Sequence, residues 1–391
     1  MVNPTDSVIA AGTDEAREII ETIERWAERE LRPVAKKYDH ADEYPEDIVA
    51  QMKELGLFGA TISPEYGGLG LSASVYARIV MSISSIWMAP VGIFNSHLIM
   101  AACVQRHGTP AQKQRWLPRF ATGELRGGIG LTEPNAGTDL QSIRSLARRE
   151  GEGYVINGTK TWITNGVQGT CFGILVKTDP EAQPRHKGMS MFICEKGDGF
   201  RAAKKIKKLG YKAIDSAELV FEDHRVEAER LVGGVEGRGF QQAVGGLELG
   251  RINVAARGAG IASGALRDAL RYSQERQTFG KPISQHQAIQ LKLADMATRV
   301  EAARLLIDQA ARKYDTGERC DLESSMAKLF ASEAGVENSL EAMRIFGGYS
   351  YSTDFDVERY YRDAPLMCIG EGTNEMQRII IARQLIERNP I

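Results

Sequence analysis

Apolar side chains recur with helical spacing over the first third of the chain. Between residues 16 and 31, isoleucines and a tryptophan repeat among acidic and basic residues, which predicts an amphipathic surface helix. Pro33 is expected to interrupt this helix, and Pro45-Glu46-Asp47 predicts the start of the next one. We therefore expect helices from Asp14 to about Gly123, with a glycine-rich link at residues 64–70.

The most apolar segment of the chain, Ile79–Gln105, contains no Asp, Glu, Lys or Arg. It is broken by Pro90 and Gly92 and carries several serines, so it is a poor candidate for a membrane-spanning helix. Two buried helices joined by a turn fit the segment better.

A different pattern begins near Gly127, where β-branched and aromatic residues form short runs. Asn157-Gly158 and Asn165-Gly166 bracket the run Thr159–Thr164, and Asn-Gly pairs are typical of β-hairpin turns. Further strand-like runs occur at Tyr154–Ile156, Phe172–Lys177, Met189–Glu195 and Ala217–Phe221. These runs predict a small antiparallel β domain that ends near Leu231.

Helical spacing returns after a glycine-rich loop and holds to the end of the chain. The predicted helices are Phe240–Gln277, Ser284–Thr316, Leu322–Phe346 and a run from Asn374, which suit a four-helix bundle. The predicted fold is therefore an α+β multidomain protein, with a helical domain at 1–126, a β domain at 127–235 and a helical bundle at 236–391.

Composition excludes several classes of partner and site. The 391 residues include 49 basic and 51 acidic side chains, so no global field attracts nucleic acid or an anionic membrane. The five cysteines form no CxxC pair, which argues against a disulfide framework or a zinc site. Met1–Thr13 lacks the pattern of a secretory signal, so the cytoplasm is the expected compartment.

The strongest candidate for chemistry is Glu371, which lies between Gly370 and Gly372 just before an apolar helix. Asn374 and Gln377 have nearly the spacing of a capping box, which places the helix start here. A carboxylate on such a turn can serve as a general base, or it can be an ordinary solvated glutamate at a helix entry. The residues around it leave both interpretations open.

Three other loops combine glycine with groups that can hold a polar ligand. Ile129–Asp139 offers hydroxyls and backbone N–H groups, Arg276–Ile283 places arginine and threonine beside a sharp turn, and Arg344–Tyr349 contains paired glycines. The first is equally explained as a turn at a domain junction, whereas a capped interhelical loop and a helix C-cap are the favoured explanations of the second and third. Gly258–Gly264 lies in a helical pattern without a βαβ unit, which favours close helix packing over dinucleotide binding.

Taken together, these stretches resemble the acyl-CoA dehydrogenase family over nearly the whole chain. The motifs occur in the family's order, at Pro64–Gly70, Leu131–Asp139, Trp162–Asn165, Arg276–Gly280, Ile345–Gly348 and Glu371–Thr373. The resemblance implies a helical domain, a β domain and a helical bundle that assemble as a homotetramer with FAD.

The resemblance also assigns residues to the cofactor. Those expected around the flavin ring are Ile129, Leu131, Thr132, Trp162, Ile163 and Thr164. Those expected at the pyrophosphate and adenosine are Arg276, Thr278, Phe279 and Gln287, while Arg344, Gly347 and Gly348 would reach a neighbouring subunit's cofactor. Thr138 would lie near both FAD and the thioester, and Thr373 and Glu375 would close the site.

The implied reaction is α,β-dehydrogenation of an acyl-CoA thioester. A base removes the α-proton, the β-hydride passes to the flavin, and a trans-2-enoyl-CoA remains; an electron-transferring flavoprotein then takes the electrons. The family places the base either in the Glu-Gly-Thr turn or on a helix just before an arginine. Here the first position is Glu371 and the second is Gly250, before Arg251, so we expect Glu371 to be the base and Arg251 to orient it.

Two departures from the family pattern concern the acyl group. The residue before the base is often aromatic, but Gly370 stands here and leaves room for a branched or bulky group. Trp87-Met88-Ala89 lacks the arginine that would meet a dicarboxylic substrate. We therefore expect a short, medium or branched acyl-CoA, with a flavin oxidase or monooxygenase and a non-catalytic binding protein as alternatives on the same fold.

Overall fold

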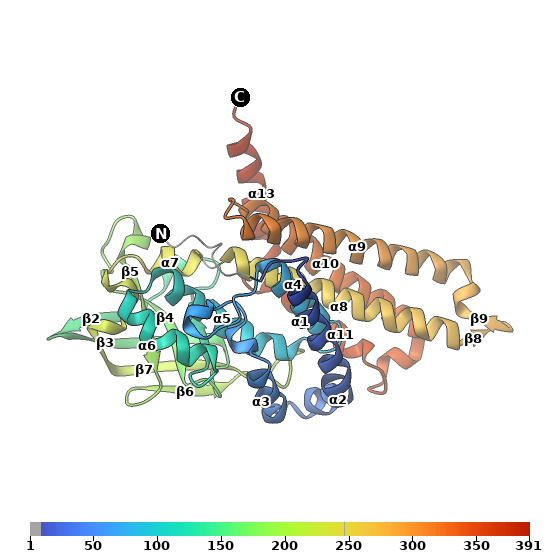
Figure 1. Cartoon of the computed structure of the whole chain (residues 1–391), viewed down its shortest axis with the longest axis horizontal. Coiled ribbons are helices and arrows are strands. Elements are labelled where there is room, and N and C mark those ends of the chain that lie inside the picture. Colours follow the sequence, from blue (N-terminus) through green and yellow to red (C-terminus); the bar gives the residue numbers. More distant parts are fainter. Residues whose placement is uncertain (1–8, 246) are drawn as a thin grey trace.

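Helices, then a β sheet, then helices follow one another along the chain, as predicted. The computed structural model describes residues 9–245 and 247–391, so the first eight residues of the segment inspected for a secretory signal lie outside it. Figure 1 shows the sheet at one end of the molecule, the long helices α8, α9 and α10 reaching the other end, and α13 projecting away from them.

The N-terminal helices are α1 (Asp14–Trp26), α2 (Arg32–Ala41), α3 (Glu46–Glu54), α4 (Ala73–Ser84), α5 (Ala89–His107) and α6 (Pro110–Ala121). The interruption expected at Pro33 is a break in the α-helical hydrogen bonding just before that residue. A π-helical turn, Ala27–Leu31, joins α1 to α2, and Pro33 lies in the first turn of α2. Proline is tolerated there because a first-turn N–H needs no helical partner.

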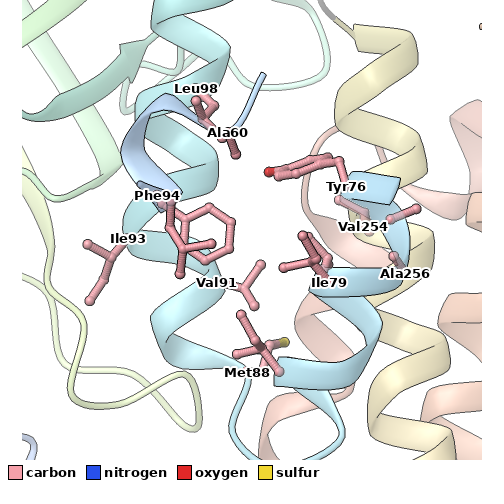
Figure 2. Packing of buried hydrophobic residues seen from close by; sticks show 14 of the residues in the cluster. Ala60, Tyr76, Ile79, Met88, Val91, Ile93, Phe94, Leu98, Val254 and Ala256 are labelled. Carbon is pink, nitrogen blue, oxygen red and sulfur yellow. The ribbon is translucent and has the colours of Figure 1, made fainter. Parts of the chain in front are cut away.

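The apolar segment Ile79–Gln105 forms α4 and α5, two largely buried helices as expected. Pro90 lies in the first turn of α5. Figure 2 shows Val91 and Phe94 of α5 pointing toward Ile79 of α4. Among the described residues, no helix is long and apolar enough to cross a membrane.

The strands are β1 (Gly127–Gly130), β2 (Leu146–Glu150), β3 (Gly153–Thr164), β4 (Cys171–Lys177), β5 (Met189–Glu195), β6 (Phe200–Lys205) and β7 (Ser216–Glu227). They form one sheet in the order β1-β4-β2-β3-β7-β6, with β5 on the other side of β4. The sheet is mixed rather than purely antiparallel, because β4 pairs in parallel with β1 and β2.

Neither Asn-Gly pair makes the predicted hairpin. Asn157-Gly158 lies inside β3, where the pairing with β7 shifts register, and the Asn157 amide donates to Asp223 on β7. A Cβ on Gly158 would lie 2.2 Å from Oγ of Ser145, so close approach requires this glycine. Asn165-Gly166 does turn the chain, but it leads to β4, which does not pair with β3.

The C-terminal helices are α7 (Gly239–Val244), α8 (Leu247–Glu275), α9 (Gln287–Asp315), α10 (Asp321–Phe346), α11 (Val357–Asp363), α12 (Pro365–Ile369) and α13 (Asn374–Arg388). A two-stranded ribbon, β8 (Gln277–Thr278) with β9 (Lys281–Pro282), joins α8 to α9. The single helix predicted from Phe240 is thus two helices, α7 and α8.

The glycines of residues 258–264 serve helix packing, as the sequence favoured. A Cβ on Gly258 would lie 2.6 Å from the Ala331 carbonyl oxygen of α10, and one on Gly264 would lie 2.3 Å from that of Ser85. Small residues therefore let α8 approach α10 on one side and the end of α4 on the other.

Candidate active site

Glu371 lies on the turn between α12 and α13, in a left-handed backbone conformation with φ +53°. Thr373 caps α13 by accepting a hydrogen bond from the backbone N–H of Met376. The N-cap is therefore Thr373, one residue before the Asn374 that the capping-box spacing indicated. The Asn374 side chain is instead buried, and its Oδ1 accepts a hydrogen bond of 2.7 Å from Nζ of Lys328.

The Glu371 carboxylate is held from one side. Its Oε1 accepts hydrogen bonds from Nδ2 of Asn95 at 3.1 Å and from Nη2 of Arg257 at 3.3 Å. Its Oε2 is buried and has no hydrogen-bond partner among the described residues. Since the side chain is only 21% exposed, a freely solvated helix-entry glutamate does not describe this residue.

Arg257, rather than the expected Arg251, contacts the carboxylate. Seven residues separate Gly250 from Arg257, close to two turns of α8, so both lie on one helix face, whereas Arg251 is turned by about 100°. A Cβ on Gly250 would lie 2.3 Å from Oε2 of Glu371, so this face meets the carboxylate. Arg251 is 8% exposed, and its Nε has no partner within the described part of the chain.

The pKa of the Glu371 carboxyl is set by opposing effects. Burial is the largest and raises the pKa above its ordinary value, while the Arg257 charge and the Asn95 hydrogen bond lower it. A raised pKa brings a carboxylate closer to the basicity that proton abstraction requires.

A loop from the β domain completes the surroundings of Arg257. Nη1 of Arg257 donates to the Tyr211 hydroxyl at 3.4 Å, and the backbone N–H of Tyr211 donates to Asp363 at 2.5 Å. A Cβ on Gly92 would fall 1.4 Å from the Tyr211 hydroxyl, so only glycine fits beneath this ring. The loop between β6 and β7 therefore packs against α5 and α8 beside Glu371.

The residues expected around a flavin ring come together where β1 meets the end of β3. The Thr132 carbonyl oxygen accepts from the Thr161 N–H at 2.9 Å, and the Leu131 carbonyl oxygen accepts from Nζ of Lys160 at 3.1 Å. Ile129 and Thr164 lie on these two strands and are partly buried. Lys160 also forms a buried ion pair of 2.8 Å with Glu133, which fixes the loop after β1.

Trp162 and Ile163 face opposite ways. Trp162 is 59% exposed with φ +61°, while the Ile163 side chain is buried in the core of the sheet. Ile163 could therefore reach a ligand only through its backbone. Thr138 is exposed on the loop after β1.

Helix α5 connects this strand end to Glu371. Asn95 contacts the carboxylate, and a Cβ on Gly128 of β1 would lie 2.3 Å from Oγ of the next residue, Ser96. Consecutive residues of one helix thus touch the candidate base and the strand that carries the expected ring contacts.

Thr373 and Glu375 lie beside Glu371 at the start of α13, but the residues expected at the pyrophosphate and adenosine lie elsewhere, at the end of the bundle marked by β8 and β9 in Figure 1. A groove of about 570 Å³ there is lined by Arg276, Thr278, Gly347 and Gly348. Phe279 beside it is 97% exposed with φ +51°. The structure does not bring this group to Glu371 within one chain.

The other residues assigned to this end have their own contacts. Gln287 is the first residue of α9, and Arg344 of α10 pairs with Glu341. A Cβ on Gly347 or Gly348 would meet nothing within 4 Å, so the backbone is open here. Arginine, threonine and open backbone suit a diphosphate, and the residues present therefore fit the FAD pyrophosphate.

Comparison with known proteins identifies the family. Profiles of the N-terminal, middle and C-terminal domains of acyl-CoA dehydrogenases match residues 13–124, 128–224 and 237–386. The chain belongs to the acyl-CoA dehydrogenase family. It is an oxidoreductase with acyl-CoA dehydrogenase activity, in a family of flavoproteins.

Individual relatives of this acyl-CoA dehydrogenase match over nearly full length. An acyl-CoA dehydrogenase of Bacillus subtilis is 40% identical, with 93% of this chain and 96% of the relative covered. A short-chain specific acyl-CoA dehydrogenase of Clostridium acetobutylicum is 38% identical, with 95% and 98% covered. A chain in a structure described as the electron transferring flavoprotein of Acidaminococcus fermentans superposes with a TM-score of 0.93 at 39% identity, covering 96% of this chain and 98% of that one.

Sequence reasoning missed Asn95, Arg257 and Tyr211. Asn95 lies in the apolar segment that was interpreted as core, and Tyr211 follows a lysine-rich stretch without a recognisable motif. The spacing from Gly250 could have found Arg257, because the seventh residue along a helix returns to the same face.

Proposed function

We propose that this enzyme oxidises short or branched acyl-CoA thioesters to trans-2-enoyl-CoA, with Glu371 as the base that removes the α-proton. The observation that carries the proposal is the state of its carboxylate, which is largely buried and held at Oε1, with Oε2 free of partners among the described residues. A general base needs an oxygen free to accept the proton and a fixed direction of approach.

We infer that FAD is the cofactor, with its ring against the β1 and β3 residues and with Thr138 near both ring and thioester. When bound, FAD supplies the acceptor for the β-hydride. The groove at Arg276 and Thr278 lies away from Glu371, which supports a site completed by a second copy of the chain. In that assembly Arg344, Gly347 and Gly348 serve the neighbouring subunit's cofactor, and Thr373 and Glu375 border the site.

The preference for a short or branched acyl group rests on Gly370 and on one relative. A Cβ on Gly370 would make only an ordinary contact of 3.4 Å with the Leu366 carbonyl oxygen. The position therefore has space beside it that no side chain of its own fills. The Clostridium acetobutylicum relative is described as short-chain specific. The similar chain in the electron transferring flavoprotein structure supports such a flavoprotein as the electron acceptor.

The test is a panel of acyl-CoA thioesters added to the purified yellow protein without oxygen. Butyryl-CoA and isobutyryl-CoA are expected to bleach the flavin band faster than palmitoyl-CoA, and bleached enzyme should reduce an electron-transferring flavoprotein. Rapid peroxide formation in air would favour the oxidase instead. An enzyme that no thioester bleaches would refute the proposed function.

A further inference from the structure

We propose that Arg257 and Asn95 are positioning residues that hold Oε1 of Glu371 and thereby make Oε2 the oxygen that accepts the α-proton. The inference rests on the proposed function and adds to it which oxygen reacts and which residues select it. The C–H bond at the α-carbon breaks, its proton bonds to Oε2, and its electron pair becomes available for the new double bond as the β-hydride departs to the flavin.

The Asn95 amide can present only its donor to Glu371. Nδ2 of Asn253 donates to the Tyr76 hydroxyl at 3.0 Å, and that hydroxyl donates to Oδ1 of Asn95 at 3.1 Å. With Oδ1 engaged, Nδ2 faces the carboxylate. Figure 2 shows the Tyr76 hydroxyl pointing toward α5. All three side chains are buried, so the direction of this relay from α8 through α4 and α5 is fixed.

The position of the Arg257 guanidinium is also fixed by its contacts. Its side chain is buried, and its guanidinium lies between Oε1 of Glu371 and the Tyr211 hydroxyl. Tyr211 is fixed in turn, because its N–H bonds Asp363 and the N–H of Ala213 bonds Asp42 at 3.1 Å. The arginine therefore approaches the carboxylate from a single direction.

On the other side of the carboxylate, Oε2 packs against Gly250, which has no side chain. Oε2 lies 2.3 Å from the point where a Cβ on Gly250 would stand, so any larger residue would displace it. The two carboxylate oxygens thus have different surroundings. Oε1 faces two hydrogen-bond donors, whereas Oε2 faces the backbone of α8 at Gly250.

The pKa of Glu371 depends on the charged groups around it, so the role of Arg257 can be measured. The charged groups that act on Glu371 are Arg257 and Arg251 from α8 and Lys328 from α10, and the Tyr76 and Tyr211 hydroxyls complete its titratable surroundings. Arg257 is the strongest of these influences and lowers the Glu371 pKa. Loss of this charge should therefore raise the Glu371 pKa, because the ionised carboxylate loses its main counter-charge.

The experiment compares Arg257→Gln, Arg257→Lys and the control Arg267→Gln in the FAD-loaded enzyme. Glu371 must be ionised to accept a proton, so kcat/KM falls as the pH drops through its pKa. In Arg257→Gln this acid limb should move to higher pH by about one unit or more. Arg257→Lys should restore it. Arg267 lies on the same helix and bonds Ser85 and Tyr360 instead, so its variant should match the wild type.

A second measurement needs no turnover. Carboxyl-labelled glutamate followed by ¹³C NMR, with the Glu371 signal assigned from Glu371→Gln, reports the titration directly. The same upward shift is expected in Arg257→Gln, and Asn95→Ala should shift in the same direction by less. Coincident titrations and pH profiles for wild type and Arg257→Gln would overturn the proposal while the proposed function stands. Wild-type enzyme that no thioester bleaches would instead refute the function.

Discussion

At the scale of the residue, the site depends on small side chains next to a strained one. Glu371 has a positive φ, as do Trp162 and Phe279, and each of these is a residue that the family resemblance assigns to the site. Non-glycine residues in this conformation cost free energy and persist only where the surrounding structure holds them. Their occurrence at three predicted site positions supports a site in which geometry is maintained at the expense of stability.

Gly250 provides the residue-scale prediction. In Gly250→Ala the new methyl group would stand 2.3 Å from Oε2, so the carboxylate must move by about 1 Å. Such a displacement of a reacting group lowers rates by about a hundredfold. Anaerobic flavin reduction by butyryl-CoA, measured by stopped flow, should slow accordingly while FAD stays bound.

Gly197→Ala is the matched control for that variant, because a Cβ there meets nothing within 4 Å and no site residue is near it in sequence. Its flavin reduction rate should equal that of the wild type. A Gly250→Ala enzyme that reduces its flavin at the wild-type rate would show that Oε2 does not need this space.

At the scale of the element, periodicity predicted the helices well and predicted the links between them poorly. Helix α1 follows an amphipathic spacing that depends only on near neighbours in sequence. The errors fell where a distant residue decides the local structure. Asn157-Gly158 would suit a hairpin, but Asp223 on β7 and Ser145 after β1 keep it within a strand.

The same limit applies to the site. The Gly-Glu-Gly turn marked Glu371 because its signal is local, and the resemblance rested on local motifs as well. Asn95 and Arg257 both contact the Glu371 carboxylate, but they are separated from Glu371 in the sequence by 276 and 114 positions, respectively. No pattern within a window of sequence reports such contacts, so the partners of the base emerged only from the packing of α5 against α8.

At the scale of the whole molecule, helix α13 carries large apolar side chains that remain exposed in the single chain. Ile379 and Ile386 are 59% and 74% exposed and lie seven residues apart, on one face of the helix. Because α13 projects from the bundle (Figure 1), another copy of the chain is the partner that we expect to cover this face.

The variant Ile379→Glu with Ile386→Glu should therefore assemble into a smaller species than the wild type, because it would bury charge in the contact. Light scattering coupled to size exclusion gives the mass. Arg378→Glu reverses a charge on the same helix, turned by about 100° from Ile379, and is the matched control, with little change expected. An unchanged mass in the isoleucine variant would exclude this face from the assembly.

The account depends most on Glu371 as the base, and the most direct measurement is anaerobic flavin reduction in Glu371→Gln. Glutamine keeps the shape and an oxygen for Asn95 and Arg257 but cannot accept the α-proton. We predict that the variant retains its FAD and yellow colour and loses bleaching by butyryl-CoA, while Glu387→Gln on α13 bleaches as the wild type does. Bleaching at the wild-type rate in Glu371→Gln would contradict the account.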